Sequence, residues 1–158
     1  DLDLILSLVK SNIKSIHASG IKIVSSTVDM ANARIEFENK CIANLTASRI
    51  SQKNMRKMRL FQKEQYTTID FQTASIEEYK VCDMHPNTKN SDKIIEINGE
   101  HKKHIIYKKP KIKKYDALKI ELEHFIHSIN NFSKPETDGE SATRALSVAL
   151  EIHNIINI

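Results

Sequence analysis

Glycine is scarce in this chain, and its placement excludes the common nucleotide-binding loops. The three glycines, Gly20, Gly99 and Gly139, stand far apart in the sequence. Loops of the form G-x-G-x-x-G or G-x-x-x-x-G-K-[ST] need clustered glycines, because backbone N–H groups must come close to the phosphates. The chain therefore lacks the usual dinucleotide or nucleotide site, and any such cofactor has to be held by another part of the protein.

Long apolar runs are missing and cysteine is rare. The longest uninterrupted apolar stretches are three or four residues, which predicts no membrane span. Asp1 stands in place of Met and no basic start with an apolar core follows, so we expect no signal peptide. Cys41 and Cys82 lie outside any C-x-x-C spacing, in strand-like runs where free cysteine behaves as a small hydrophobe. A reducing, cytoplasmic setting is expected.

The size and composition predict one globular domain with a mildly basic charge. The chain has 158 residues, of which 40% are hydrophobic and 28% charged, and its net charge is +4. Seven lysines fall within 101–114. Such a run suits phosphate or nucleic acid, although it more often protects the edge of a strand. Few aromatic residues lie among the basic ones to stack on bases, so no nucleic-acid partner is expected.

The first half of the chain predicts a helix followed by strands. Residues 2–10 carry four apolar side chains on one helical face: Leu2, Ile5, Leu6 and Val9. From Ile13 to Val24 the β-branched content is high and Gly20 interrupts, which predicts two short strands or one bulged strand.

A hairpin is expected over residues 28–51, with Asn39–Lys40 as a two-residue turn. This turn sets a register in which Phe37 pairs with Ile42, Ile35 with Asn44, Ala33 with Thr46, Arg34 with Leu45 and Met30 with Arg49. A type I′ turn needs positive φ at both positions, which Lys40 tolerates poorly. We therefore expect a small strain or a different turn.

Further strands and two helices complete the pattern. Strands are predicted over 56–62, 66–72, 76–82, 94–98 and 105–109, with a turn at 63–65 and a loop over 83–92. A helix begins at Asp116 with one apolar stripe: Leu118, Leu122, Phe125, Ile126 and Ile129. A second covers 141–156 and is expected to bury Ala145, Leu146, Val148, Ala149, Ile152, Ile155 and Ile156.

This order of elements predicts an α+β fold. It consists of about seven strands in a large, mostly antiparallel sheet with helices packed on one face. The other face is left open, which predicts a partner domain or subunit.

The first C-terminal helix carries His and Glu residues at a spacing typical of metal ligands, but no second helix supplies a matching set. His124 and His127 each follow a glutamate at helical spacing, which resembles a metal-binding E-x-x-H pattern. The last helix offers only Glu151 and His153 as converging ligands. A hydrated helix face with Glu121 and Glu123 as charge partners is the favoured interpretation, and no metal is expected.

Nucleophilic catalysis has little support. No G-x-S-x-G motif occurs. Cys82 and His85 lie three residues apart at the end of a strand, outside any recognisable frame.

Arginine is concentrated in one segment. Within 46–70, which has no acid before Glu64, five basic residues are concentrated in 49–59: Arg49, Lys53, Arg56, Lys57 and Arg59. Because arginine binds phosphate in bidentate fashion, this concentration indicates an anionic ligand. An interface or an exposed strand face explains it equally well.

Two C-terminal runs, DALKIELEHFIHSI (116–129) and DGESATRALSVAL (138–150), resemble the closing pattern of the Gfo/Idh/MocA oxidoreductase family. Three middle runs are similar to a branch that includes UDP-N-acetylglucosamine 3-dehydrogenase-like enzymes, which oxidise the C3 hydroxyl of the sugar. These runs are DMANARIEFEN (29–39), TASRIS (46–51) and RKMRLFQ (56–62). The resemblance covers nearly the whole chain.

The resemblance implies that residues 1–158 are the C-terminal substrate-binding and oligomerisation domain of a two-domain enzyme. The family's N-terminal Rossmann domain, absent here, binds NAD or NADP and supplies a lysine. The open sheet face implies a homo-oligomer, dimer or tetramer. The parent would oxidise a hydroxyl of a nucleotide sugar by hydride transfer. The fragment alone is expected to bind no cofactor and to be inactive.

The family's catalytic histidine lies in a D-x-x-x-H-x-x-D pattern at the start of a helix. Asp3 matches the last aspartate of that pattern, so the histidine would directly precede Asp1 and no catalytic residue is expected in this chain. Lys40 replaces a glycine common at the hairpin turn. With a UDP-sugar substrate, the resemblance and the local charge together suggest Arg49, Lys53 and Arg56 as pyrophosphate contacts.

A second interpretation is non-enzymatic. In it, the chain is a self-associating structural module whose arginine cluster serves an interface. The parent sequence distinguishes the two: an upstream G-x-G-x-x-G, a lysine in an E-K-P-type motif and a histidine before Asp1 favour the enzyme.

Overall fold

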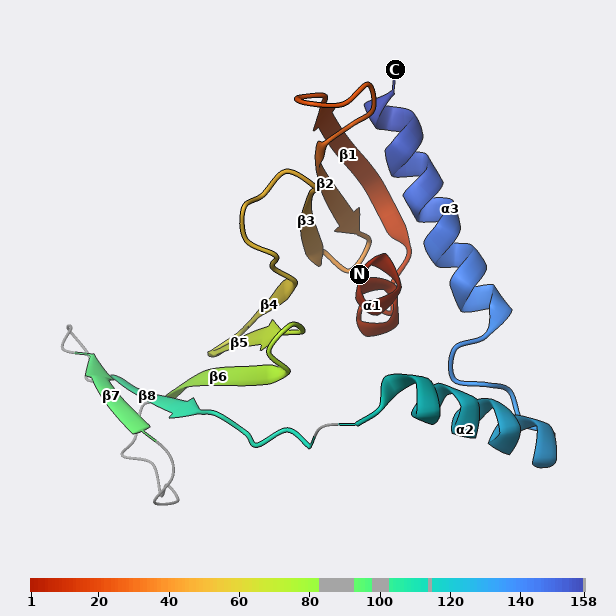
Figure 1. Cartoon of the computed structure of the whole chain (residues 1–158). Coiled ribbons are helices and arrows are strands. Elements are labelled where there is room, and N and C mark those ends of the chain that lie inside the picture. Colours follow the sequence, from red (N-terminus) through yellow and green to blue (C-terminus); the bar gives the residue numbers. More distant parts are fainter. Residues whose placement is uncertain (83–92, 98–102, 114, 158) are drawn as a thin grey trace. The chain divides into compact units, whose positions relative to one another are not determined.

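The computed structural model describes residues 1–82, 93–97, 103–113 and 115–157 (Figure 1). The chain divides into two compact units. Unit 1 comprises Asp1–Gln52 and Leu118–Ile158, and unit 2 comprises Lys53–Ala117. Each unit has its own antiparallel sheet.

Unit 1 combines three helices with a three-stranded sheet, here called sheet A. Its elements are α1 (Leu2–Leu8), β1 (Ile13–Ile21), β2 (Met30–Phe37), β3 (Ile42–Ser48), α2 (Ala117–Asn130) and α3 (Gly139–Ile156). The strand order is β1-β2-β3. The predicted N-terminal helix is confirmed. Residues 13–21 form one irregular strand, with the register shift between Ile13 and Ser15 rather than at Gly20.

The core of unit 1 lies between one face of sheet A and the helices α1 and α3. Ile35 and Phe37 are fully buried on β2, and they pack with Leu6 of α1 and Val148 of α3. Figure 1 shows α3 running along β1 on this side of the sheet. Alternation along β2 explains the arrangement, because its odd-numbered residues face the helices while Asn32, Arg34 and Glu36 face the other way.

The predicted register of the β2–β3 hairpin is wrong by one residue. Ile35 pairs with Ala43 rather than Asn44, and Met30 pairs with Ser48 rather than Arg49. The connection has one residue more than a two-residue turn. Lys40 adopts the left-handed conformation with φ of 68°, and its N–H donates to the carbonyl of Phe37. A turn followed by one left-handed residue adds that position, which moves every cross-strand partner by one. The different turn expected at Lys40 is therefore confirmed.

Helix α3 starts two residues before the predicted position because Asp138 caps it. The Asp138 carboxylate accepts a hydrogen bond of 2.7 Å from the N–H of Ser141, which is the usual N-cap contact. Val148 is buried as predicted, whereas Leu146 is 59% exposed and its predicted burial is wrong. At 100° per residue, Leu146 lies outside the arc that holds Ala145, Val148 and Ile152.

Unit 2 is a five-stranded sheet, here called sheet B. Its strands are β4 (Lys57–Gln62), β5 (Gln65–Asp70), β6 (Ser75–Cys82), β7 (Lys93–Ile97) and β8 (Lys103–Lys108). Their order is β4-β5-β6-β8-β7, and every neighbouring pair is antiparallel. The second predicted hairpin is present with Lys63–Glu64 as its turn. The predicted loop at 83–92 lies outside the described residues.

The α+β class with antiparallel sheets is confirmed, but the strands form two sheets where one large sheet was expected. Residues 49–56, between β3 and β4, contain no strand, and they interrupt the ladder. In the described part of the chain, no helix has the length and apolar character needed to cross a membrane.

Candidate functional site

The predicted anion-binding residues are divided between the two units. Arg49 follows β3 in unit 1, whereas Lys53 and Arg56 lie at the start of unit 2. The Arg56 guanidinium lies 5.0 Å from the centre of the Phe71 ring, so a cation–π contact positions it. Lys53 is exposed in the irregular segment before β4. Each of the three side chains is exposed, as a ligand contact requires, but no single compact unit holds all three.

Arg49 lies beside a buried carboxylate that sequence reasoning missed. The Asp29 side chain is fully buried. Its carboxylate accepts hydrogen bonds from the backbone N–H groups of Ile23, Val24 and Ser25 at 2.7–3.0 Å and from the Ser25 hydroxyl at 2.7 Å. These donors, the Ser25 hydroxyl first, hold the pKa of Asp29 far below its usual range. Asp29 thus stays ionised and fixes the loop 22–28.

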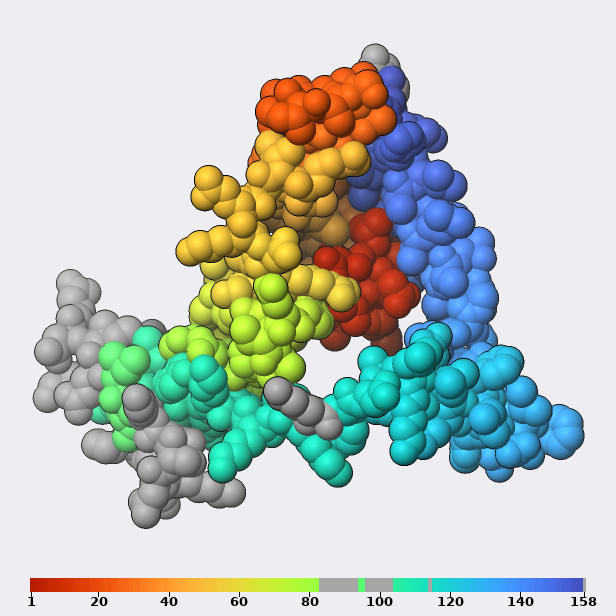
Figure 2. All heavy atoms as spheres, viewed as in Figure 1, coloured from red at the N-terminus to blue at the C-terminus, as the bar shows by residue number. Residues whose placement is uncertain are grey.

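Arg49 forms the rim of a hollow between sheet A and α3. Its Nε lies 3.8 Å from Asp29 Oδ1 and its Nη1 donates to Thr27 at 3.3 Å, yet 61% of the side chain is exposed. The hollow has a volume of about 480 Å³, with Ala31, Ala149 and Ile152 among its apolar lining residues. His153 of α3 lies at the same hollow. Figure 2 shows the loop 22–28 as an orange knob beside the C-terminal end of α3. The arrangement offers one accessible guanidinium above an apolar floor.

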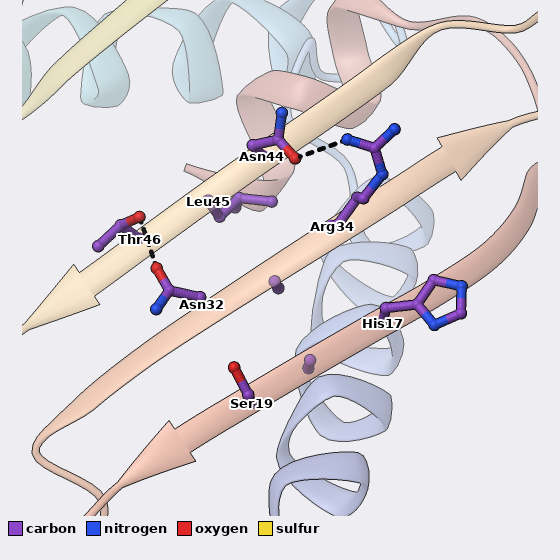
Figure 3. Close-up of a pocket in the computed structure, with 9 residues that line it drawn as sticks. His17, Ser19, Asn32, Arg34, Asn44, Leu45 and Thr46 are labelled. Atoms are coloured by element: carbon purple, nitrogen blue, oxygen red, sulfur yellow. Dashed lines mark hydrogen bonds between the residues drawn. The ribbon is translucent and has the colours of Figure 1, made fainter.

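The other face of sheet A carries a polar groove (Figure 3). This groove has a volume of about 410 Å³ and crosses all three strands. Arg34 Nη1 donates to Asn44 at 3.3 Å, and Thr46 donates to the Asn32 side chain at 2.8 Å. Arg34 also pairs with Glu36 at 3.3 Å. These side chains satisfy one another, so the groove has the chemistry of a solvated or interfacial sheet face.

The N-terminal helix places the motif aspartate in its first turn. Asp3 lies in the first turn of α1, and Asp1 occupies the N-cap position. A residue directly before Asp1 would therefore sit at the entrance to this helix.

The metal-like residues of α2 point to separate partners. His124 lies 3.5 Å from Glu136, and His127 contacts Asn131 at 3.2 Å. Among the residues that the structure describes, no three His, Cys, Asp or Glu side chains gather as a metal site. Neither Cys41 nor Cys82 is in a disulfide bond.

Sheet B carries a row of aromatic rings on one face. Phe61, Tyr66, Tyr79 and Tyr107 occupy successive strands with ring centres 4.9, 5.5 and 5.1 Å apart. On the same face, Lys109 pairs with Glu77 at 3.1 Å and Lys57 with Asp70 at 3.2 Å. Burial raises the pKa of Tyr79, and the Glu77 carboxylate adds to this effect. Phe61, at the end of the row, is 77% exposed.

A curated relative matches almost the whole chain. UDP-N-acetylglucosamine 3-dehydrogenase of Acidithiobacillus ferrooxidans is 29% identical over 152 residues, which are 96% of this chain and 44% of that enzyme. The chain is homologous to this dehydrogenase. The match falls in its C-terminal part, so the chain spans less than half of the relative's length. No protein-family model matches the chain.

Solved structures share the fold. The structure of UDP-N-acetylglucosamine 3-dehydrogenase GnnA from A. ferrooxidans aligns with 99% of this chain and 44% of its own, with a TM-score of 0.81 and 27% identity. An NAD-binding protein from Listeria innocua aligns with a TM-score of 0.69, 21% identity and coverage of 99% and 42%. An aldose–aldose oxidoreductase from Caulobacter crescentus aligns with a TM-score of 0.71, 14% identity and the same coverage. These neighbours are of the Gfo/Idh/MocA type, which confirms the resemblance noted in the sequence.

Two signals in the sequence pointed to the features that were missed. The run Ser25-Ser26-Thr27-Val28-Asp29 has the small hydroxyl residues and the following aspartate typical of a side-chain-stabilised loop. The alternation of Asn32, Arg34 and Glu36 along one strand marks the polar face of sheet A.

Proposed function

We propose that this chain is the C-terminal substrate-binding part of an NAD(P)-dependent oxidoreductase that acts on a hydroxyl of a nucleotide sugar. The observation that carries the proposal is the homology to UDP-N-acetylglucosamine 3-dehydrogenase across 96% of the chain, at 29% identity. A TM-score of 0.81 with the structure of that enzyme supports it. A UDP-N-acetylglucosamine-like substrate follows as the first candidate.

The dinucleotide does not fit the described residues of this chain. Gly20 faces α3, where an added Cβ would collide with Ile156 and come 2.8 Å from Val28, so this glycine serves packing. Gly139 begins α3 as an isolated glycine. We therefore propose that NAD or NADP is held by the part of the parent outside this chain, and that hydride passes to the cofactor there. The isolated chain is expected to be inactive.

The proposed contributions of this chain are binding and positioning. Helix α1 would orient the histidine expected before Asp1, so that its imidazole accepts the proton of the substrate hydroxyl. Arg49 of unit 1 would contact the pyrophosphate, since an exposed cation binds such a group without a large desolvation cost. Lys53 and Arg56 of unit 2 are also exposed, and each is proposed as a contact of the same kind. Arg49 is the best placed, at the rim of the hollow beside Asp29.

The test uses the full-length gene product and this fragment side by side. Each is incubated with UDP-N-acetylglucosamine and NAD or NADP, and reduced nicotinamide is followed by its absorbance. Turnover by the full-length protein, with none by the fragment, supports the proposal. Cofactor binding without turnover would contradict UDP-N-acetylglucosamine as the substrate but would be compatible with the proposed class of reaction. In the active protein, Arg49→Ala should raise KM for the nucleotide sugar, with Arg34→Ala as the matched control.

We propose in addition that the chain forms a homo-oligomer through the aromatic face of sheet B. The exposed Phe61 continues the row of three tyrosines, and the two ion pairs border it as a polar rim does at interfaces. This face also favours the non-catalytic, self-associating module as the second candidate function. An oligomer that binds no dinucleotide as a full-length protein would support that second function.

A further inference from the structure

The helix α2 carries an apolar stripe that the described part of the chain leaves uncovered. Five side chains along it are between 53% and 65% exposed: Leu118, Leu122, Phe125, Ile126 and Ile129. No residue of α2 is buried. Phe132, in the turn that follows, is almost fully exposed. Figure 2 shows the side chains of α2, in teal and light blue, open to view along the helix. The predicted stripe is therefore real but lacks the partner that its pattern demands.

A stripe of this size is unusual for a free surface. It extends over about 20 Å of helix at 1.5 Å per residue. Soluble monomers rarely expose contiguous apolar patches above a few hundred Å², and larger patches mark interaction sites. A helix of 14 residues is marginal in water without packing on its apolar face. The described residues of unit 1 do not cover the stripe of α2.

We propose that the stripe of α2 is the docking surface for the part of the parent chain that precedes Asp1. This inference rests on the proposed function, since it requires that a further domain exists. The chain covers 44% of the homologous dehydrogenase and 42% of two other oxidoreductase-fold structures, so more than half of each relative lies outside it. A domain joined covalently to this chain stays at high effective concentration beside it, which favours docking on an uncovered apolar face.

The point of entry supports this occupant over a second copy of the chain. A preceding segment would join at Asp1, which occupies the N-cap position of α1, and α1 packs against α3 in unit 1. Helix α2 belongs to the same unit and leads into α3 through residues 131–138. The second copy already has a proposed surface, the aromatic face of sheet B in unit 2.

A position beside the stripe, outside its apolar residues, provides a matched control. Glu123 lies about 115° around the helix from the centre of the stripe, pairs with Lys119 at 3.8 Å and is exposed. Phe125 is aromatic and lies within the stripe, so a photoreactive p-benzoylphenylalanine replaces it with little change of shape. The same photoreactive group at position 123 shows which crosslinks form from an exposed position outside the stripe.

The experiment is photocrosslinking of the full-length gene product, with the linked peptides identified by mass spectrometry. We expect position 125 to give an intramolecular link to a peptide preceding Asp1, and position 123 to give none. A link from position 125 to a second copy, a link to another part of residues 1–158, or no link would overturn the inference. So would equal linking from both positions.

The outcome is separable from that of the proposed function. Crosslinking requires no turnover. An inactive parent that links through position 125 would therefore support the docking surface and contradict the proposed enzymatic function. An active parent that does not form this link would support the proposed enzymatic function and contradict the docking surface. Phe125→Ser in the full-length protein adds a second readout. We expect its preceding domain to unfold separately from the rest, whereas Glu123→Ser should leave a single transition.

Discussion

The two sheets of this chain use similar strands but reach opposite states of burial. In sheet A, Ile35 and Phe37 are fully buried because α1 and α3 cover one face. In sheet B, Ile106 is the one described hydrophobic residue that is buried, and the aromatic row remains open on one face. Apolar strands alone do not make a core, because a sheet face is buried only when another layer covers it. Unit 1 therefore holds its own core, whereas the described residues of unit 2 bury little apolar surface.

The largest expected effect separates two phenylalanines, one in each unit. Phe37→Ala removes a fully buried side chain and should lower the free energy of unfolding by ~3–5 kcal/mol, measured by urea denaturation. Phe61→Ala removes a side chain that is largely exposed and should change it by no more than ~0.5 kcal/mol in the monomer. Where Phe37→Ala fails to fold, Phe37→Leu replaces it. Equal losses at both positions would show that sheet B belongs to the same core as sheet A.

Gly20 tests how tightly α3 closes on sheet A. An added Cβ would collide with Ile156 Cγ2, so Gly20→Ala should destabilise unit 1 by ~1–3 kcal/mol in thermal or urea unfolding. Gly139→Ala is the control, because nothing lies within 4 Å of its added Cβ. Ile156→Ala should recover part of the loss in the Gly20→Ala background. No recovery would mean that the strain lies elsewhere.

Asp29 makes the stability of unit 1 depend on pH. Its pKa is depressed in the folded state, so the unfolded chain binds the proton more readily. The stability that it contributes is complete above the ordinary aspartate pKa of about 4, and it is lost as the pH falls through that value toward the lower folded pKa. We expect Asp29→Asn to lower the melting temperature at pH 7 by several degrees and to flatten its decline between pH 5 and pH 3.

The control for this pH dependence is Arg49. Because its side chain is largely exposed and the separation from Asp29 is 3.8 Å, Arg49→Met should leave the decline with pH almost unchanged. A loss of the decline in Arg49→Met would contradict the view that the loop donors, rather than the arginine, hold Asp29 in its ionised form.

Most elements were predictable because each depends on local periodicity. The strand and helix positions follow from β-branched runs and from the 3.6-residue period, and they agree with the structure within a few residues. The hairpin register was not predictable, since it depends on one left-handed residue, Lys40, that sequence patterns disfavour. The separation into two sheets depends on the irregular segment 49–56, which resembles a strand connection in sequence.

The candidate site was less accessible to sequence reasoning. The basic residues at 49, 53 and 56 were visible, but their division between two units was not, because sequence spacing carries no information on domain boundaries within one charged run. The hydroxyl-rich run before Asp29 is typical of a side-chain-stabilised loop, but the backbone N–H groups of 23–25 that bind its carboxylate are common to every sequence and mark no position in advance. The stripe of α2 was seen, but a periodic pattern identifies an apolar face without naming what covers it.

The smallest expected effect compares the two hairpin turns. Lys40 in unit 1 and Glu64 in unit 2 are both left-handed, with φ of 68° and 59°. Glycine adopts this conformation without the Cβ penalty, so Lys40→Gly and Glu64→Gly should each stabilise their own hairpin by ~0.5–1 kcal/mol. Amide hydrogen exchange measures which strands each substitution stabilises. If the units open independently, Lys40→Gly slows exchange in sheet A and Glu64→Gly slows it in sheet B alone. If either substitution protects both sheets equally, the two units unfold together and their contrast in burial has no counterpart in stability.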